Sequence, residues 1–238
     1  MLHLELVTES TFKKIVDMKL PPEQDCFVAP NVVSLAQAWL YYKNARPYAI
    51  CNDNNVVGFI MLDWDEGERT VGIWRFMIAP EHQQKGYGRK AMETVIKLVR
   101  EAGMIDLIHL SFVPNNKIAH DLYCSLGFRE NGDVEDGEIV MEMPLTDNPK
   151  VGMLIADDED MEDFIELIES EKEAGSSVPA EFENSSFIEK AIADGNVKRF
   201  TVMGKTIGLA VNGVMLIDNQ NLSYLAQAML LMNAQTCS

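Results

Sequence analysis

The spacing of apolar positions predicts a strand-rich chain in which helices separate many of the strands. Apolar or alternating runs predict strands at residues 2–7, 47–51, 56–64, 73–79, 105–113 and 137–145. Apolar positions three and four apart predict helices at residues 11–18, 34–44, 90–103 and 116–127. Because helices cross between strands, we expect an α/β fold with a mixed central sheet that closes near Leu145.

Local signals predict the ends and faces of these elements. NDNN, residues 52–55, is a hairpin turn, because Asn and Asp tolerate turn conformations. Ser34 is the expected N-cap of the second helix, and Gly103 and Gly127 end the third and fourth. The expected buried positions are Ala91, Val95, Leu98 and Val99 in the third helix and Ile118, Ala119, Leu122 and Leu126 in the fourth, with Tyr123 bordering that stripe.

TDNPK, residues 146–150, is a predicted linker between a domain at residues 1–146 and a smaller α+β domain at residues 151–238. Matching Leu6 to Leu154 and Gly58 to Gly208 gives offsets of 148 and 150. This layout predicts a degenerate half repeat, although two unrelated hairpins preceded by helices would look alike. Residues 221–234 are a helical candidate with one apolar face, formed by Leu222, Leu225, Ala226, Met229 and Leu230.

Charge and composition exclude some classes of binding partner. The formal charge of −17 disfavours nucleic acid, because its phosphates require clustered Lys and Arg. Such a field attracts a cationic small molecule, or serves solubility alone. Apolar runs of membrane-spanning length and export features are absent from the sequence, so we expect no membrane partner and a cytoplasmic location. Four dispersed cysteines without a CxxC predict free thiols and no zinc site: Cys26, Cys51, Cys124 and Cys237.

The stretch EHQQKGYGRKA, residues 81–91, places glycines and cations where a helix begins. It is not a P-loop, because no Lys-Ser or Lys-Thr follows the second glycine. A dinucleotide fingerprint starting at Gly86 fails in context, because six residues separate it from the strand and Asp106 opens the next strand. The spacing QxxGxG from Gln83 predicts inward N–H groups and a helix N-terminus that bind a pyrophosphate, with charge from Lys85 and Arg89.

Two stretches together resemble a known family. IAPEHQQKGYGRKAMETVIKLV, residues 78–99, is similar to the acetyl-CoA-binding motif of the GNAT N-acetyltransferase superfamily. NNKIAHDLYCSLGFRENG, residues 115–132, resembles its second motif, NxxAxxLYxxxGF. Within that superfamily QDCFVAPNVVSLAQA, GIWRFMIAP and DGEIVMEM resemble the bacterial spermine/spermidine N-acetyltransferases. The resemblance does not extend beyond residue 150.

The resemblance implies the GNAT fold, acetyl-CoA as cosubstrate, no metal, and direct attack by an amine within a ternary complex. It implies that the strand before the loop splays from its neighbour and holds the acetyl-pantetheine through main-chain groups. The implied cofactor contacts are Phe76, Met77, Ile78, Gln83, Gln84, Lys85, Gly86, Tyr87, Gly88, Arg89 and Asn116. Tyr123 matches the Tyr of the second motif and is the implied general acid, because a phenol can protonate a thiolate.

The general base stays open, because Ile73, Trp74 and Arg75 stand where some relatives carry an acidic residue. Four carboxylates are candidates for a water chain or for a second ammonium group of the acceptor: Glu23, Asp63, Asp65 and Glu138. Covalent catalysis by Cys124 is disfavoured, because no motif pairs it with a His, although His120 lies one turn before it.

We therefore expect an N-acetyltransferase that acts on a small cationic amine, with spermidine or spermine as leading acceptor. Amino sugars, amino acids and protein amines are alternative acceptors, and a non-catalytic acetyl-CoA-binding module is an alternative of another class. For the C-terminal half we expect either packing on the catalytic domain or a homodimer contact.

Overall fold

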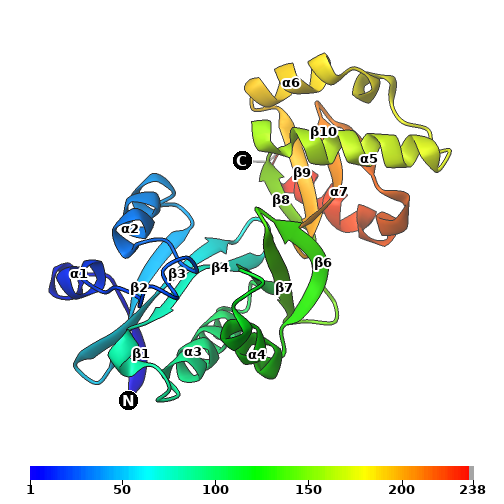
Figure 1. Cartoon of the computed structure of the whole chain (residues 1–238). Coiled ribbons are helices and arrows are strands. Elements are labelled where there is room, and N and C mark those ends of the chain that lie inside the picture. Colours follow the sequence, from blue (N-terminus) through cyan, green and yellow to red (C-terminus); the bar gives the residue numbers. More distant parts are fainter. Residues whose placement is uncertain (236–238) are drawn as a thin grey trace. The chain divides into compact units, whose positions relative to one another are not determined.

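The computed structural model describes residues 1–235 and divides into two compact units (Figure 1). The first unit comprises residues 1–65 and 70–145, whereas residues 66–69 group with the residues from 146 onward. Its strands are β1 (Leu2–Leu6), β2 (Ala45–Asn52), β3 (Asn55–Asp65), β4 (Thr70–Ile78), β5 (Leu107–Phe112), β6 (Arg129–Glu135) and β7 (Glu138–Pro144). Its helices are α1 (Glu9–Val16), α2 (Asn31–Leu40), α3 (Tyr87–Ala102) and α4 (Lys117–Leu126).

These strands form one sheet in the order β1-β2-β3-β4-β5-β7-β6. The β4–β5 pair is parallel and the other pairs are antiparallel, so the sheet is mixed, as the sequence predicts. The predicted order of elements lacks β6, because the polar segment RENGDVE has no apolar pattern that would predict a strand. In the structure this segment is mostly exposed and pairs with β7.

Strands β4 and β5 diverge after a short paired stretch. Their pairing runs from Thr70 with Leu107 to Gly72 with His109, and stops there. The β3–β4 register jumps between Met61–Arg75 and Leu62–Ile73, so that Trp74 is an extra, bulged residue. A bulge bends its strand and increases the local twist. Main-chain groups of β4 beyond Gly72 therefore face a wedge in place of a β5 partner.

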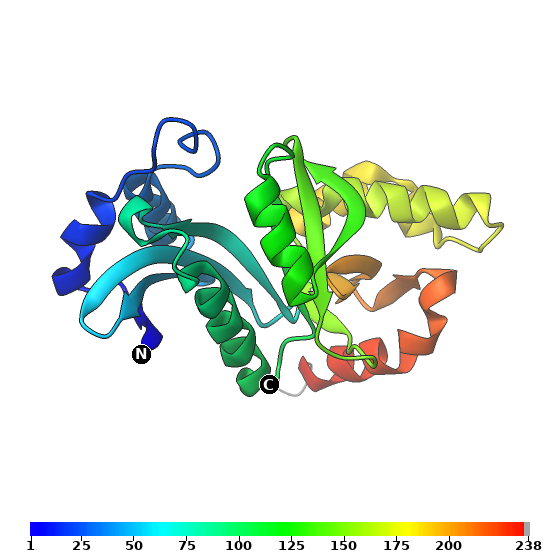
Figure 2. The same ribbon diagram turned by 60° about the horizontal axis from the view of Figure 1, so that its bottom comes forward.

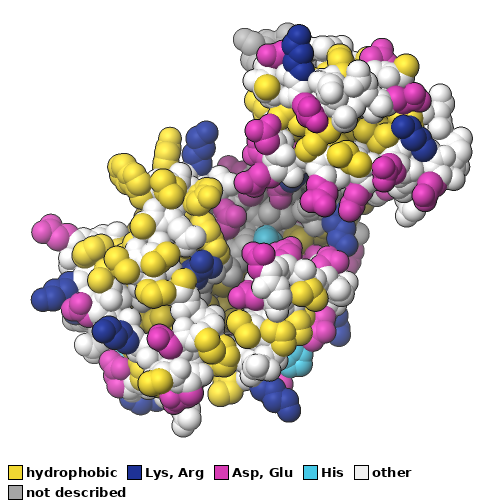
Figure 3. All heavy atoms as spheres, turned by 45° about the horizontal axis from the view of Figure 1, so that its top comes forward, with side chains coloured by type: hydrophobic (Ala, Val, Ile, Leu, Met, Phe, Trp, Pro, Cys, Tyr) yellow, Lys and Arg dark blue, Asp and Glu magenta, His cyan; other side chains and the backbone are white. Residues whose placement is uncertain are grey.

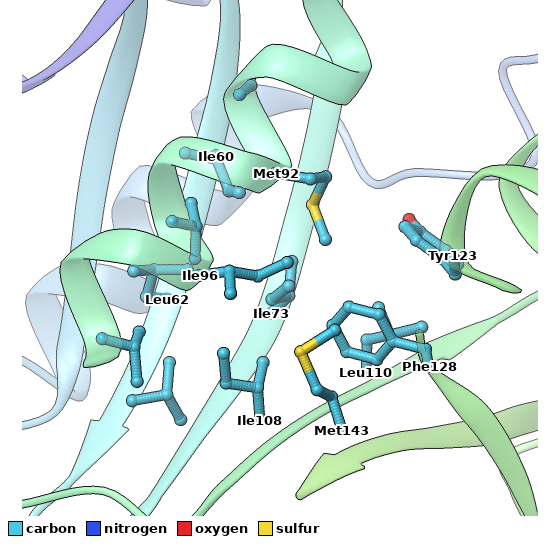
Figure 4. Close-up of a cluster of buried hydrophobic side chains, with 14 of the residues drawn as sticks. Ile60, Leu62, Ile73, Met92, Ile96, Ile108, Leu110, Tyr123, Phe128 and Met143 are labelled. Carbon is cyan, nitrogen blue, oxygen red and sulfur yellow. The ribbon is translucent and has the colours of Figure 1, made fainter. Parts of the chain in front are cut away.

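Helices cover the two faces of this sheet, with α1 and α2 on one side and α3 and α4 on the other (Figures 1 and 2). Under α3 and α4 lies the main core, which includes the side chains of Figure 4. Ala91, Val95 and Val99 of α3 are buried as predicted, but so are Met92 and Ile96, which widens the predicted stripe. Gly103, with φ of +70°, ends α3.

One position in the predicted face of α4 and the predicted N-cap of α2 are wrong. In α4, Ile118 is 80 % exposed, whereas Tyr123 is only 6 % exposed and lies inside the core. In α2, Pro30 is the N-cap and Ser34 lies a turn inside the helix, where it is buried and donates to the Pro30 carbonyl oxygen at 3.5 Å. Asn31 is the first residue of this helix, and its side chain donates to the Ile15 carbonyl oxygen of α1 at 3.0 Å.

Helices α1 and α2 leave large apolar side chains uncovered within their unit. On the face drawn in Figure 3, hydrophobic side chains gather over these helices. The exposed ones are Phe12, Val32, Val33, Trp39, Leu40, Tyr41 and Tyr42. Across residues 1–235, each helix is too short or too polar to cross a membrane.

The second unit contains a sheet of four antiparallel strands in the order β11-β10-β9-β8. Its elements are β8 (Gly152–Ile155), α5 (Met161–Glu173), α6 (Ser185–Ala193), β9 (Val197–Val202), β10 (Lys205–Val211), β11 (Val214–Ile217) and α7 (Leu225–Gln235). Chain order and strand order match those from β1 through α1 and α2 to β4. The layout predicted as a half repeat is thus present in the fold.

Local details agree between the two sheets. A Cβ on Gly58 would lie 2.4 Å from the Met77 carbonyl oxygen, and one on Gly208 would lie 2.5 Å from that of Leu216. Each glycine directly follows a bulge in its strand pairing. Thr8 and Asp157 form equivalent capping boxes before α1 and α5. Two unrelated hairpins that merely look alike would not need the same glycine, bulge and capping box.

The end of the second unit departs from the predicted helical face. Helix α7 starts at Leu225, and Leu222 belongs to a preceding short 3-10 segment and is exposed. Ala228 is fully buried, whereas Met229 and Leu230 are exposed. The rotation of α7 about its own axis decides which face is buried against the sheet. An almost uniformly apolar helix does not encode that rotation in its sequence.

Candidate active site

The glycine loop leads from β4 into α3 with main-chain N–H groups left open. Gln84 has a φ of +59° and Gly86 a φ of +77°, both in the left-handed region, and α3 begins at Tyr87. Gly86 is the N-cap of α3 and supplies no side-chain cap. The first N–H groups of a helix have no partner within it, so this end can accept an anion.

Gln83 fixes the loop to the strand that precedes it. Its Nε2 donates to the Ile78 carbonyl oxygen at 3.1 Å and to Gln24 Oε1 at 2.8 Å. Gln24 Nε2 donates back to Gln83 Oε1 at 3.2 Å. The side chain of Gln83 thus braces the loop, and sequence reasoning missed its partner Gln24, because the two residues are far apart in the chain.

The cations of the loop stand beside its N–H groups. Lys85 Nζ donates to the Glu81 carbonyl oxygen at 2.6 Å. Arg89 donates to Ser125 Oγ of α4 and lies 3.9 Å from Glu93. A Cβ on Gly88 would lie 3.7 Å from Leu122 and 3.8 Å from Phe76, so this glycine adjoins both β4 and α4. The loop thus combines local positive charge with exposed main chain in an acidic protein.

Tyr123 projects from α4 into the core beside the wedge. Its ring centroid lies 6.3 Å from that of Phe112 and 6.0 Å from that of Phe128. Figure 4 shows its hydroxyl turned away from Phe128 and toward the side of Met92. Burial raises the pKa of the Tyr123 phenol well above its usual range, and the charge of Glu138 raises it further. The phenol therefore holds its proton at neutral pH and can donate it.

Asn116, the other predicted cofactor contact in this motif, caps α4. Its Oδ1 accepts a hydrogen bond from the Ala119 N–H at 3.1 Å. The capping interaction uses one lone pair of this oxygen, so the amide nitrogen and the second lone pair are left for a ligand.

Glu138 lies on β7, on the same face of the sheet as Ser111 and Glu142. It accepts a hydrogen bond from Ser111 of β5, and its charge reaches both Tyr123 and Arg75. Arg75 donates to the Trp74 carbonyl oxygen at 2.7 Å and to Gln37 Oε1 at 3.2 Å. Burial lowers the pKa of Arg75, against the effect of Glu138. Arg75 therefore places a partly buried cation on β4 beside the wedge.

The other candidate carboxylates are not gathered around Glu138. Asp63 and Asp65 end β3, and Asn44 Nδ2 donates to Asp65 Oδ2 at 3.1 Å. Burial raises the pKa of Asp63, Asp65 raises it further and His109 lowers it. Glu23 is exposed in the loop next to Gln24. The structure thus brings Asp63 and Asp65 together and leaves Glu23 and Glu138 at other positions.

Sequence reasoning missed His109. In β5, His109 and Ser111 alternate with Ile108 and Leu110, which belong to the core under α3 and α4. The two polar residues therefore lie on the opposite face of the sheet, toward the side of α1 and α2. Polar residues at alternate positions of a buried strand are the signal that identifies such a face.

Residues 1–235 contain free thiols and one group of potential metal ligands. Cys26, Cys51 and Cys124 are free, as predicted, and Cys237 lies outside the described residues. Cys124 Sγ is 3.4 Å from His120 Nε2, and both are on α4. One group of potential metal ligands comes together on β1 and β2, formed by His3, Glu5 and Cys51.

Comparison with known proteins identifies the family. The profile of the acetyltransferase (GNAT) family matches residues 12–128. The spermine/spermidine N(1)-acetyltransferase of Bacillus subtilis (strain 168) is 30% identical over an alignment of 149 residues, and the match covers 59% of this chain and 96% of that protein. The chain belongs to the GNAT acetyltransferase family. This acetyltransferase uses acetyl-CoA and acetylates an amine.

Solved structures agree on the fold. Spermidine N-acetyltransferase from Vibrio cholerae, in complex with CoA and spermine, has a TM-score of 0.52 at 19% identity. It covers 60% of this chain and 95% of its own. A domain from Methanocaldococcus jannaschii has a TM-score of 0.51 at 18% identity and covers 61% of this chain and 99% of its own.

Proposed function

We propose that this acetyltransferase transfers the acetyl group to a primary amine of a polyamine such as spermidine or spermine. The observation that carries the proposal is the wedge between β4 and β5, which has a protonated phenol on one side and carboxylates at both of its ends. Tyr123 and Glu138 lie toward the open end, and Asp63 pairs with Gly72 at the closed end. The curated relative from Bacillus subtilis acts on spermine and spermidine by its name.

In this proposal the wedge and the loop hold acetyl-CoA. Main-chain groups of Phe76, Met77 and Ile78 lie beyond the last β4–β5 pair and can bind the pantetheine arm as a neighbouring strand would. The uncapped N–H groups from Tyr87 onward, with Lys85 and Arg89 beside them, bind the pyrophosphate. Gln83 supports this site by bracing the loop.

The reaction is a direct attack on the thioester. The neutral amine adds to the acetyl carbonyl carbon, the C–S bond breaks, and the thiolate takes the proton of Tyr123. A thiolate is a weaker base than the phenolate that remains, so the transfer is completed by proton return from the acylated nitrogen to Tyr123. The net products from the neutral amine are the N-acetyl amine and CoA.

The spread of the carboxylates favours an acceptor with several ammonium groups. Glu138 lies four residues along β7 from Glu142, roughly 13 Å away at 3.3 Å per residue. Glu142 is level with Asp63 across the sheet. A monoamine meets only one of these charges, whereas a polyamine reaches both.

Steady-state kinetics with spermidine and butylamine test the acceptor class. Replacing Glu138 with Gln should raise KM for spermidine roughly fivefold, equivalent to about 1 kcal/mol, and change KM for butylamine little. The matched control is Glu135→Gln, because Glu135 is exposed and pairs with Glu138 across β6 and β7. Equal KM changes for both amines, or turnover of amino sugars or lysine peptides in place of polyamines, contradict the proposal.

We also propose that the second unit is a degenerate half repeat without its own acetyl-CoA site. Asp218 occupies the place that the glycine loop has after β4, and its Oδ1 accepts from the Gln220 N–H at 2.8 Å. A carboxylate therefore already supplies the negative charge there. The unit then serves packing on the catalytic domain or a homodimer contact, which truncation after Lys150 tests through activity and sedimentation.

A further inference from the structure

We propose that His109 is the residue that accepts the proton from the acceptor ammonium group, directly or through one water. This inference rests on the amine acetylation proposed above and adds the general base that the motifs leave open. The base must lie near the wedge, be able to bind a proton near neutral pH, and face the side from which an amine can approach.

The position of His109 is set by strand pairing. Asp63 pairs with Gly72, Gly72 with His109, and His109 with Glu142. Residues paired across neighbouring strands point to the same face, so these side chains form one row across β3, β4, β5 and β7. The row stands at the last β4–β5 pair, where the wedge closes. This face is opposite to the one that α3 and α4 cover.

Gly72 leaves the space that the imidazole uses. A Cβ at Gly72 would lie 3.1 Å from both Cε1 and Nε2 of His109 and 3.4 Å from Asp63 Cβ. The ring of His109 therefore reaches across β4 from β5, toward the carboxylate of β3. Any larger residue at position 72 would displace the ring.

The charges around the ring suit a base. Asp63 faces it from β3 and Glu142 faces it from β7, while Gly72 of β4 carries no side chain. Partial burial lowers the pKa of His109, and the two carboxylates raise it. The lowered pKa of His109 keeps its imidazole neutral at physiological pH. Within residues 1–235, neither ring nitrogen forms a hydrogen bond to a protein group, so both can meet water or substrate.

The carboxylates of the site are poorer candidates for this step. Glu138 accepts a hydrogen bond from Ser111, and its charge acts on Arg75, so this carboxylate is already engaged by neighbouring groups. Glu142 accepts a hydrogen bond from Asn131 Nδ2 at 2.8 Å. The negative charges of Asp63 and Glu142 support an imidazolium ion at His109.

With His109 as the base and Tyr123 as the acid, every proton of the reaction is accounted for. The ammonium group loses one proton to His109, and its lone pair attacks the acetyl carbon. The C–S bond breaks, Tyr123 protonates the thiolate, and the second proton of the acylated nitrogen returns to Tyr123. His109 releases its proton to solvent after the products leave. One positive charge moves from the amine to His109 during the step, and Asp63 and Glu142 stabilise it there.

The test compares wild type, His109→Gln and the control His120→Gln in kcat/KM profiles from pH 6 to pH 10 with the best polyamine. Wild type and control should level off below neutrality, because the lowered pKa of His109 keeps the imidazole neutral above that point. His109→Gln should fall about 10²- to 10⁴-fold at pH 7 and keep rising about tenfold per pH unit, because it depends on the free amine. Acetyl-CoA affinity should be unchanged in all three.

An amine substrate of lower basicity distinguishes two roles for His109, proton acceptor and structural residue. The 2,2-difluoro analogue of the amine has a much lower ammonium pKa, so a far larger fraction of it is unprotonated at pH 7 and it should recover most of the His109→Gln defect. Gly72→Ala, which displaces the ring, should show the same dependence on amine basicity. An unchanged pH profile, or an equal defect with both amines, overturns the role of His109. Wild-type turnover confined to amines other than polyamines overturns only the acceptor class.

Discussion

Replacing Tyr123 with Phe removes one oxygen from the site and leaves the surrounding packing in place. The ring keeps its contacts with Phe112 and Phe128, and only 6 % of the residue is exposed. Within residues 1–235 the hydroxyl makes no hydrogen bond to a protein group, so its loss strands no partner. The free energy of unfolding should therefore change by less than about 1 kcal/mol.

The effect on rate should be much larger. General acid catalysis contributes about 10²- to 10⁴-fold, or about 3 to 5 kcal/mol of activation free energy. Because burial holds the pKa of Tyr123 above its usual range, the loss in kcat should be constant between about pH 6 and pH 9. Acetyl-CoA affinity should not change.

The assay is CoA release detected with a thiol reagent, alongside urea unfolding and acetyl-CoA titration. Tyr48→Phe is the matched control, because Tyr48 packs against the same core from β2. A Tyr123→Phe variant that folds normally and keeps more than about a third of wild-type kcat would refute the reasoning. So would an equal loss of rate in Tyr48→Phe.

Other positions give sharp expectations. Gly88→Ala should fold normally, since its Cβ meets only ordinary contacts, but raise the acetyl-CoA dissociation constant about tenfold in titrations. Gly58→Ala and Gly208→Ala should each lower the unfolding free energy of their own unit by about 1–3 kcal/mol in urea, because each Cβ meets a carbonyl oxygen. Wild-type stability should fall above about pH 10, where unfolded Tyr123 ionises and the folded phenol, with its raised pKa, does not; Tyr123→Phe should lessen this loss in unfolding at pH 9 and pH 11. Truncation after Lys150 should reduce activity or change the sedimentation coefficient beyond the loss of mass; a fully active fragment with the parent's oligomeric state contradicts the role given to the second unit.

Much of the fold follows from local sequence signals. The hairpin at residues 52–55, the ends of α3 and α4 at Gly103 and Gly127, and the glycine loop each depend on neighbouring residues, so they were predictable. Gly58 and Gly208 marked the similarity of the two sheets, because each permits a close approach of main chains. The proposed pyrophosphate site belongs to this class.

Properties that depend on register were less predictable. Tyr123 is central to the core, although helical spacing placed it at the border, because the packing of α4 against the sheet sets its rotation. Strand β6 is polar and forms by pairing with β7. The row of Asp63, Gly72, His109 and Glu142 requires the pairing of strands far apart in the chain.

CoA release from acetyl-CoA across an amine panel tests the central claim most directly. The panel comprises spermidine, spermine, diamines, butylamine, aminoglycosides, amino acids and lysine peptides, with the N-acetyl product identified by mass spectrometry. We predict saturable turnover in which one CoA is released per N-acetylated polyamine, with kcat/KM far higher than for butylamine. Turnover of an amino sugar, amino acid or peptide with silent polyamines would contradict the account.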